Sequence, residues 1–230
     1  MKVKCLTKEI NSKDYNAITV NNCYIVLSIE VYDKECSSFA KSVGNHLLYR
    51  IENDTGSVIP YPSTLFQVIS GKLPRGWVVV QDQSCFKVLP ESWSFDSFWE
   101  SYYNDDSTTL ELYKIEKESM LLEELTVNEI SRTFRENDSS KIDTILYAMI
   151  NHEDKRFMGI VLEYSKASLQ NDSKYFSSNS LSNSLVLAFT YLSRFKIIEV
   201  EEFFIDYLAE SYIQKQKLTD IINDYFASNP

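Results

Sequence analysis

Histidine and cysteine, which bind zinc and take part in nucleophilic catalysis, are few in this chain and widely spaced. Of its 230 residues only two are histidines, His46 and His152. The four cysteines, which form no CxxC pair, are Cys5, Cys23, Cys36 and Cys85. Because structural zinc sites need closely spaced thiolate and imidazole ligands, this spacing predicts no zinc site. Asp105 and Asp106 are adjacent carboxylates, but no histidine or further acidic motif stands near them, so we expect no metal.

The patterns that bind nucleotide cofactors or activate a serine do not occur either. The five glycines, which are too sparse for GxGxxG or GxxxxGK[ST], are Gly44, Gly56, Gly71, Gly76 and Gly159. A phosphate-binding loop needs backbone without Cβ beside the ligand, so we expect no dinucleotide or P-loop cofactor. The chain has no GxSxG sequence, although a cysteine and a histidine could still meet in the fold as a nucleophile pair. The sequence therefore predicts a protein that is not an enzyme.

A row of carboxylates is the first feature suited to act on another molecule. Its members, which recur at steps of 3, 4 and 4 residues, are Glu199, Glu202, Asp206 and Glu210. This spacing places them on one face of a helix over residues 199–210, opposite apolar residues such as Phe203 and Tyr207. Like charges so arranged cost roughly 0.2–0.5 kcal/mol per pair, which favours a role in binding a cationic surface. The alternative is an ordinary solvated helix face.

The densest aromatic run, over residues 93–106, also mixes tyrosine and tryptophan with carboxylates. Helical spacing predicts that four of its aromatic side chains pack inward, namely Phe95, Phe98, Trp99 and Tyr102. The residues left outside, which are candidates for binding a partner, are Asp96, Glu100, Tyr103, Asp105 and Asp106. Tyrosine and tryptophan supply contact area and hydrogen bonds at a low entropy cost, which suits a protein interface. The alternative is an amphipathic core helix with a polar back.

The charge balance and the apolar pattern limit the class of protein further. The chain is acidic, with a formal net charge of -10 and a pI of about 4.8. Since phosphate contacts need clustered Lys and Arg, we expect no nucleic acid as a partner. No apolar run approaches the length of a membrane span, and residues 1–16 lack the apolar core of a signal peptide. We expect a cytoplasmic protein with reduced thiols and no membrane contact.

Two different kinds of element must position the candidate residues. Before residue 105 the sequence predicts a strand over 24–32, hairpins over 46–61 and 77–89, and helices over 63–70 and 95–104. After it, Gly and Pro nearly vanish, and helices are predicted over 108–122, 141–150, 154–168, 181–195, 199–210 and 214–227. The fold class expected is therefore α+β. A module with a small antiparallel sheet spans residues 1–107, and an all-α array spans residues 108–230.

Local motifs mark the limits of some of these helices. Thr126-Val-Asn-Glu129 predicts a capping box, in which each of the two side chains accepts a backbone amide proton of the other residue. Ser140-Lys-Ile-Asp143 resembles the same device, with Asp in place of Glu. Residues 170–180, QNDSKYFSSNS, are rich in Ser and Asn and predict a polar loop.

The helical half resembles a HEAT-type repeat array. The stretches that carry the resemblance are residues 142–148, 151–154, 185–194, 200–208 and 218–226. Among them, Leu-Ala-x-x-x-Leu-x-Arg at 187–194 is similar to small HEAT-like proteins of bacterial polymorphic toxin loci. The N-terminal half, at residues 59–63 and 89–106, resembles small α+β immunity modules of the same kind of locus. HEAT units are helix pairs that bury their faces only against the next pair.

The resemblance implies an immunity protein of a contact-dependent growth inhibition or related toxin system. Such a protein binds a cognate antibacterial toxin domain, often a basic nuclease such as an RNase, and occludes its active or substrate site. An acidic chain fits this expectation, because complementary charge raises association rates to about 10⁸ M⁻¹s⁻¹ at low salt. The alternative is a HEAT-like scaffold or adaptor with a cellular partner. The oligomeric state is left open.

Overall fold

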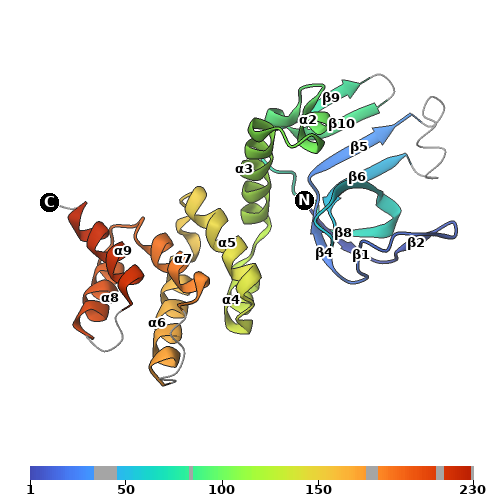
Figure 1. Cartoon of the computed structure of the whole chain (residues 1–230). Helices are drawn as coiled ribbons and strands as arrows, with labels where there is room; N and C mark the ends of the chain where they lie inside the picture. The colour runs from blue at the N-terminus through green and yellow to red at the C-terminus, as the bar shows by residue number, and fades with distance from the viewer. Residues whose placement is uncertain (34–45, 83–84, 175–180, 211–214, 229–230) are drawn as a thin grey trace. The chain divides into compact units, whose positions relative to one another are not determined.

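The computed structural model of the chain describes residues 1–33, 46–82, 85–174, 181–210 and 215–228. They form two compact units, Met1–Glu124 and Leu125–Pro230 (Figure 1). The boundary lies one helix later than the one expected after residue 107. The reason is α3 (Ser107–Glu124), which packs on the N-terminal unit, where the hydroxyl of Tyr113 donates to the carboxylate of Glu52 at 2.9 Å.

The N-terminal unit is built from antiparallel strands, and the expected α+β class is confirmed. The strands are β1 (Lys2–Cys5), β2 (Glu9–Ile10), β3 (Lys13–Asp14), β4 (Cys23–Ile25), β5 (Ser28–Tyr32), β6 (Leu47–Glu52), β7 (Val58–Pro62), β8 (Phe66–Ser70), β9 (Trp77–Asp82) and β10 (Cys85–Pro90). They form a three-stranded sheet in the order β4-β1-β8, a five-stranded sheet in the order β7-β6-β5-β10-β9, and the β2-β3 pair (Figure 1). The two predicted hairpins are confirmed as β6–β7 and β9–β10.

The strand expected over residues 24–32 is divided into β4 and β5 at Val26 and Leu27. The amide of Val26 donates to the carbonyl of Met1, beside β1, at 3.0 Å. The amide of Leu27 donates to the carbonyl of Arg50, in β6, at 2.8 Å. The chain therefore passes from one sheet to the other at these two buried residues, and a continuous run of β-forming residues does not reveal such a passage.

The helix expected over residues 63–70 is wrong. A single 3₁₀ turn over Ser63–Leu65 leads into β8, which pairs with β1 so that Phe66 lies opposite Cys5. Leu65 and Phe66 are buried in the core, while the next residues of β8 are exposed. A short apolar run fits a strand or a helix equally well, and here the neighbouring β1 decides in favour of the strand.

Two hydrophobic clusters hold the N-terminal unit together. The first lies between the sheets and comprises Met1, Val3, Cys5, Ile18, Tyr24, Val26, Tyr49, Ile51, Tyr61, Leu65 and Phe66. The second joins the five-stranded sheet to the helices and comprises Leu27, Val58, Leu89, Trp93, Phe98, Tyr113 and Met120. Its centre is Trp93, whose ring stacks on those of Phe98 and Tyr113 at centroid distances of 5.1 and 5.5 Å.

The helix expected over residues 95–104 is shorter in the structure, where α2 covers Phe98–Tyr103. Phe98 is buried, and Trp99 and Tyr102 are half-buried, as the helical spacing predicts. Phe95 precedes the helix and is 44% exposed, so its expected place in the core is wrong. Its ring meets that of Phe98 edge to face, at 5.4 Å between ring centroids.

The C-terminal unit consists of helices. They are α4 (Val127–Glu136), α5 (Ser139–Asn151), α6 (Met158–Lys174), α7 (Asn183–Leu192), α8 (Ile198–Ala209) and α9 (Gln216–Ala227), with a 3₁₀ turn at Lys155–Phe157. Every residue of α7 from Ser184 to Phe189 is buried, and this helix packs against α5, α6 and α9. Across the part of the chain that the structure describes, none of the helices has the length and apolar character needed to span a membrane.

The sequence predicts the start of α4 correctly but misplaces the cap of α5 and the end of α6. The capping box is confirmed: the hydroxyl of Thr126 accepts the amide of Glu129 at 3.2 Å, and the Glu129 carboxylate accepts the amide of Thr126 at 3.0 Å. Ser140 is not a cap, because the carboxylate of Asp138, two residues earlier, caps α5. The polar loop expected at 170–180 is shorter, since α6 continues to Lys174 and the remainder lies outside the described residues.

Candidate functional site

The predicted row of carboxylates lies on the outer face of α8. Its inner face packs against α7, where Phe189 stacks on Phe204 at 5.6 Å between ring centroids. Val200, Phe203 and Tyr207 are buried beside that contact. All four carboxylates of the row are exposed, namely Glu199, Glu202, Asp206 and Glu210. Within the described part of the chain, these four carboxylates form no ion pair with a lysine or arginine.

Two isoleucines complete the exposed surface of this helix. Ile198 and Ile205 are 60% and 56% exposed and stand seven residues apart, with Glu202 between them. Residues at this spacing share one face of a helix. We call the surface formed by Ile198, Glu199, Glu202, Ile205, Asp206 and Glu210 the α8 face. It combines an apolar strip with a row of carboxylates that form no ion pair with the lysines and arginines of the described residues.

Two features of the α8 face lower the stability of the protein when no partner is bound. Its last turn holds no basic residue, and negative charge near a helix C-terminus opposes the helix dipole by roughly 0.3–1 kcal/mol. Asp206 and Glu210 stand at that end, and Glu210 is the C-terminal cap. The two isoleucines expose apolar area that burial would stabilise by about 25 cal/mol per Å². A cationic partner with an apolar surface would relieve both penalties.

The candidates around α2 do not form one comparable surface. Asp96, Glu100 and Asp105 are exposed. Asp106 instead stabilises the start of α3: its carboxylate accepts the amide and the hydroxyl of Thr109, both at 2.8 Å. These hydrogen bonds hold the pKa of Asp106 below its usual value.

Tyr103, the fifth candidate near α2, is bound within the unit through its hydroxyl. That hydroxyl donates to the carbonyl of Val58 at 2.5 Å and accepts from the guanidinium of Arg50 at 2.7 Å. Its ring is 51% exposed, yet the polar end is already engaged. Tyr103 therefore fastens α2 to the sheet, and only its ring is available to a partner.

Tyr103 belongs to a buried charged cluster that the sequence does not predict. Arg50 is 8% exposed and Glu30 is 1% exposed, and their side chains form an ion pair with N–O distances of 2.8 and 2.7 Å. The guanidinium lies over the ring of Trp99 at 4.1 Å from its centroid. The Tyr32 hydroxyl donates to the other Glu30 oxygen at 2.9 Å. Burial, together with that carboxylate, raises the pKa of Tyr32 well above its usual range.

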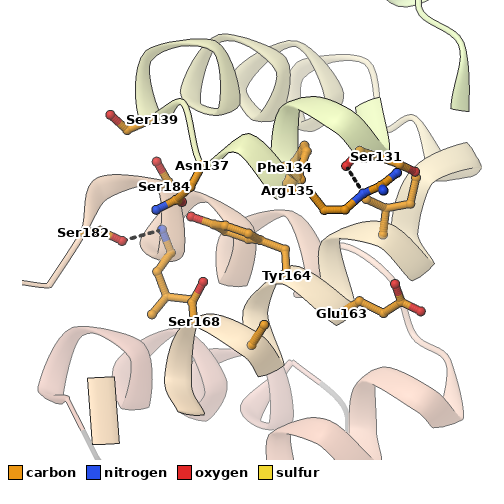
Figure 2. A pocket seen from close by; sticks show the side chains of 13 residues that line it. Ser131, Phe134, Arg135, Asn137, Ser139, Glu163, Tyr164, Ser168, Ser182 and Ser184 are labelled. Atoms are coloured by element: carbon orange, nitrogen blue, oxygen red, sulfur yellow. Dashed lines mark hydrogen bonds between the residues drawn. The ribbon is translucent and has the colours of Figure 1, made fainter. Parts of the chain in front are cut away.

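A pocket of about 750 Å³ opens between helices of the C-terminal unit (Figure 2). Phe134 and Tyr164 cross its middle, with their rings edge to face at 5.1 Å. Figure 2 shows the hydroxyl end of Tyr164 directed toward Asn137 and Ser184, whereas Arg135 lies beyond the opposite end of the ring. Five of the thirteen lining residues are serines, from α4, from the starts of α5 and α7, and from α6: Ser131, Ser139, Ser168, Ser182 and Ser184.

Three polar groups of this pocket already form hydrogen bonds within the unit. Arg135 donates from Nε to the carbonyl of Ser131 at 3.1 Å, and Ser182 accepts the amide of Leu185 at 3.2 Å (Figure 2). Ser184 donates its hydroxyl proton to Asp143 at 2.5 Å. The sequence does not reveal this pocket, because its lining comes from separate helices whose packing no local pattern encodes.

The cysteines and histidines of the described residues lie on different elements. Cys5 and Cys85 are buried, and burial raises the pKa of the Cys5 thiol, opposite to the shift that activates a nucleophile. Cys36 lies outside the described residues. His46 directly precedes β6, and His152 caps the C-terminus of α5. In the described ranges, no three His, Cys, Asp or Glu side chains gather as a metal site would require.

Comparison of the chain with protein families, with curated proteins and with solved structures finds no match. The resemblance to HEAT-type arrays and to immunity modules therefore stays a prediction from the sequence. The α8 face is the predicted surface that the structure leaves most available to a partner.

Proposed function

We propose that this protein binds a positively charged partner protein through the α8 face. The observation that supports this function most directly is the row of Glu199, Glu202 and Asp206, which is exposed and forms no ion pair among the described residues, beside two exposed isoleucines. The row spans two helical turns, or about 10 Å at a rise of 1.5 Å per residue. A single helix of a partner, or one wall of a cleft, could cover it.

The charged and the apolar residues of this face would contribute differently to binding. The carboxylates attract a basic surface over several ångströms and mainly raise the association rate, an effect that salt weakens. Ile198 and Ile205 leave water only in the complex, so their burial mainly slows dissociation. The two isoleucines would supply affinity, and the row of carboxylates would supply specificity. This division is typical of an interface with an apolar centre and a polar rim.

The kind of partner follows from the resemblance described for the sequence. We infer that it is an antibacterial toxin domain, most simply a basic nuclease, whose active or substrate site the α8 face occludes. A nuclease binds phosphates with clustered Lys and Arg, and a row of carboxylates is complementary to such a cluster. Neutralisation of an incoming nuclease takes place in the cytoplasm, which is the location that this function requires.

Co-expression with the protein encoded next to this chain tests the function. The wild-type chain should protect cells from that protein and form a complex with it. Reversing three charges of the α8 face, in a Glu199→Lys, Glu202→Lys, Asp206→Lys variant, should abolish protection and lower the association rate at least tenfold at low salt.

The exposed carboxylates near α2 supply a matched control. An Asp96→Lys, Glu100→Lys, Asp105→Lys variant changes the net charge equally but leaves the α8 face intact. It should protect as the wild type does. Equal loss in both variants would assign the effect to net charge, and full protection by the α8 variant would contradict the role of this face. Capture of a housekeeping protein instead of the neighbouring one would favour a scaffold or adaptor.

A further inference from the structure

The two edges of the five-stranded sheet are built differently. At one edge β7 carries Pro60 and Pro62, which have no amide proton to donate to an additional strand. At the other edge β9 has no proline, and from Trp77 to Gln81 it carries no charge. Folded proteins commonly protect edge strands with proline or charge, because an unprotected edge pairs with other strands. Here one edge is protected and the other is not.

β9 is also regular enough to accept another strand. It pairs with β10 along its whole length, from Trp77 opposite Pro90 to Asp82 opposite Cys85, without a bulge. A bulge would twist the edge away from a partner. Among the strands in the described ranges, β9 has β10 as its one neighbour, so its outer row of backbone groups faces no other strand.

Exposed apolar side chains lie on one face of the sheet, next to the β9 edge. Val79 is 68% exposed and lies opposite Val88, and the adjacent Phe86 is 47% exposed and lies opposite Val31. Val79 and Val88 are non-polar residues of high strand propensity, and pairs of this kind across strands stabilise a sheet. The exposed edge and the exposed face together form one apolar surface at this side of the sheet.

We propose that β9 pairs with β9 of a second copy of the chain, so that one sheet runs through both copies. A two-fold axis at Val79 would pair each strand antiparallel with its equivalent. In that register Val79 lies opposite Val79 of the other copy, Val78 opposite Val80, and Trp77 opposite Gln81. No two like charges oppose one another between Trp77 and Gln81, because this stretch is uncharged. The strand is therefore complementary to itself, which a two-fold interface requires.

The expected dimer is weak and depends on concentration. One added strand pair with a small apolar face falls at the low end of interface sizes, below the standard range of about 1,200–2,000 Å². The chain is also acidic overall, which opposes association at low salt. We expect half-assembly at or above about micromolar concentration, and tighter association as salt screens the repulsion.

Sedimentation velocity of the full chain alone tests the pairing over roughly 1–200 µM. The wild type should shift reversibly from a mass of 26.7 kDa toward twice that mass. A Val79→Lys variant, which places a charge at the centre of the pairing, should stay monomeric throughout. A matched Ile59→Lys variant, at a 38% exposed position of the proline-protected edge, should dimerise as the wild type does.

Far-UV circular dichroism of each variant checks that the fold is retained. If Val79→Lys fails to fold, Gln81→Lys introduces charge at an exposed position of the same edge and should weaken the dimer at least tenfold. A wild type that stays monomeric at all concentrations would overturn the pairing, as would open-ended aggregation or equal effects of the Val79 and Ile59 substitutions. The measurement involves no partner, so its outcome is independent of the function proposed for the α8 face.

Discussion

Replacing Arg50 with Met should strongly destabilise the N-terminal unit. The substitution keeps most of the side-chain stem but leaves the Glu30 carboxylate, which is 1% exposed, without its cation. Removing one partner of a buried ion pair typically costs about 3–5 kcal/mol, because the remaining charge stays desolvated. The contact of the guanidinium with Trp99, at 4.1 Å, adds roughly 0.5–2 kcal/mol to this loss. We therefore expect a loss of at least about 3 kcal/mol.

Urea unfolding followed by tryptophan fluorescence measures this effect in the right part of the chain. All three tryptophans, Trp77, Trp93 and Trp99, belong to the N-terminal unit, so their fluorescence reports its unfolding alone. Lys117→Met is the matched control, because Lys117 pairs with Glu52 of the same sheet but is 36% exposed. Partly exposed pairs contribute about 0–1 kcal/mol, so this variant should unfold close to the wild type.

A double substitution separates the buried charge from the lost packing. Arg50→Met with Glu30→Leu removes both charges, and replacing a buried pair by apolar residues is often neutral or stabilising. The double variant should therefore be more stable than Arg50→Met alone. The reasoning would be refuted if Arg50→Met cost less than about 1 kcal/mol, or if the double variant lost as much as the two single changes together.

Three further predictions concern caps, pH and the core. Thr126→Ala removes the capping box of α4 and should destabilise the C-terminal unit by about 1 kcal/mol in thermal unfolding followed by circular dichroism. Asp154 is partly buried, which alone would raise the pKa of its carboxyl, but the side chain and amide of Arg156 hold that pKa below the usual 3.8. Its contribution is therefore present above about pH 4 and lost as the pH falls through the lowered pKa, so Asp154→Asn should destabilise the protein more at pH 7 than at pH 3. Trp93→Ala leaves a cavity between Phe98 and Tyr113, and urea unfolding should show a loss of about 3–5 kcal/mol.

Local chemistry explains which elements the sequence could predict. The β6–β7 hairpin follows from a turn with Gly56 at a φ of 80°, and the start of α4 follows from the Thr126 capping box. The row on α8 follows from helical spacing alone. These features depend on residues a few positions apart, so a short stretch of sequence is enough to predict them.

The features that the sequence does not predict depend on contacts between segments that are far apart in the chain. Glu30 and Arg50 are twenty positions apart, and a single Glu within an apolar strand does not indicate which cation will reach it. The register of β8 was decided by β1, some sixty residues earlier in the chain. Asp106 and Tyr103 have the residue types of an interface, but their hydrogen bonds within the unit become visible only once α2 and α3 are placed.

The burial of α7 constrains how this chain can change over evolution. Substitutions from Val186 to Phe189 must preserve side-chain volume, because each of these residues is buried among its neighbours. The exposed positions of α8, among them Ile198 at 60% and Ile205 at 56%, are less constrained by packing. We therefore expect related chains to differ most at the outward positions of α8 and least along α7, so that rapid drift on one helix lies beside near-invariance on its neighbour.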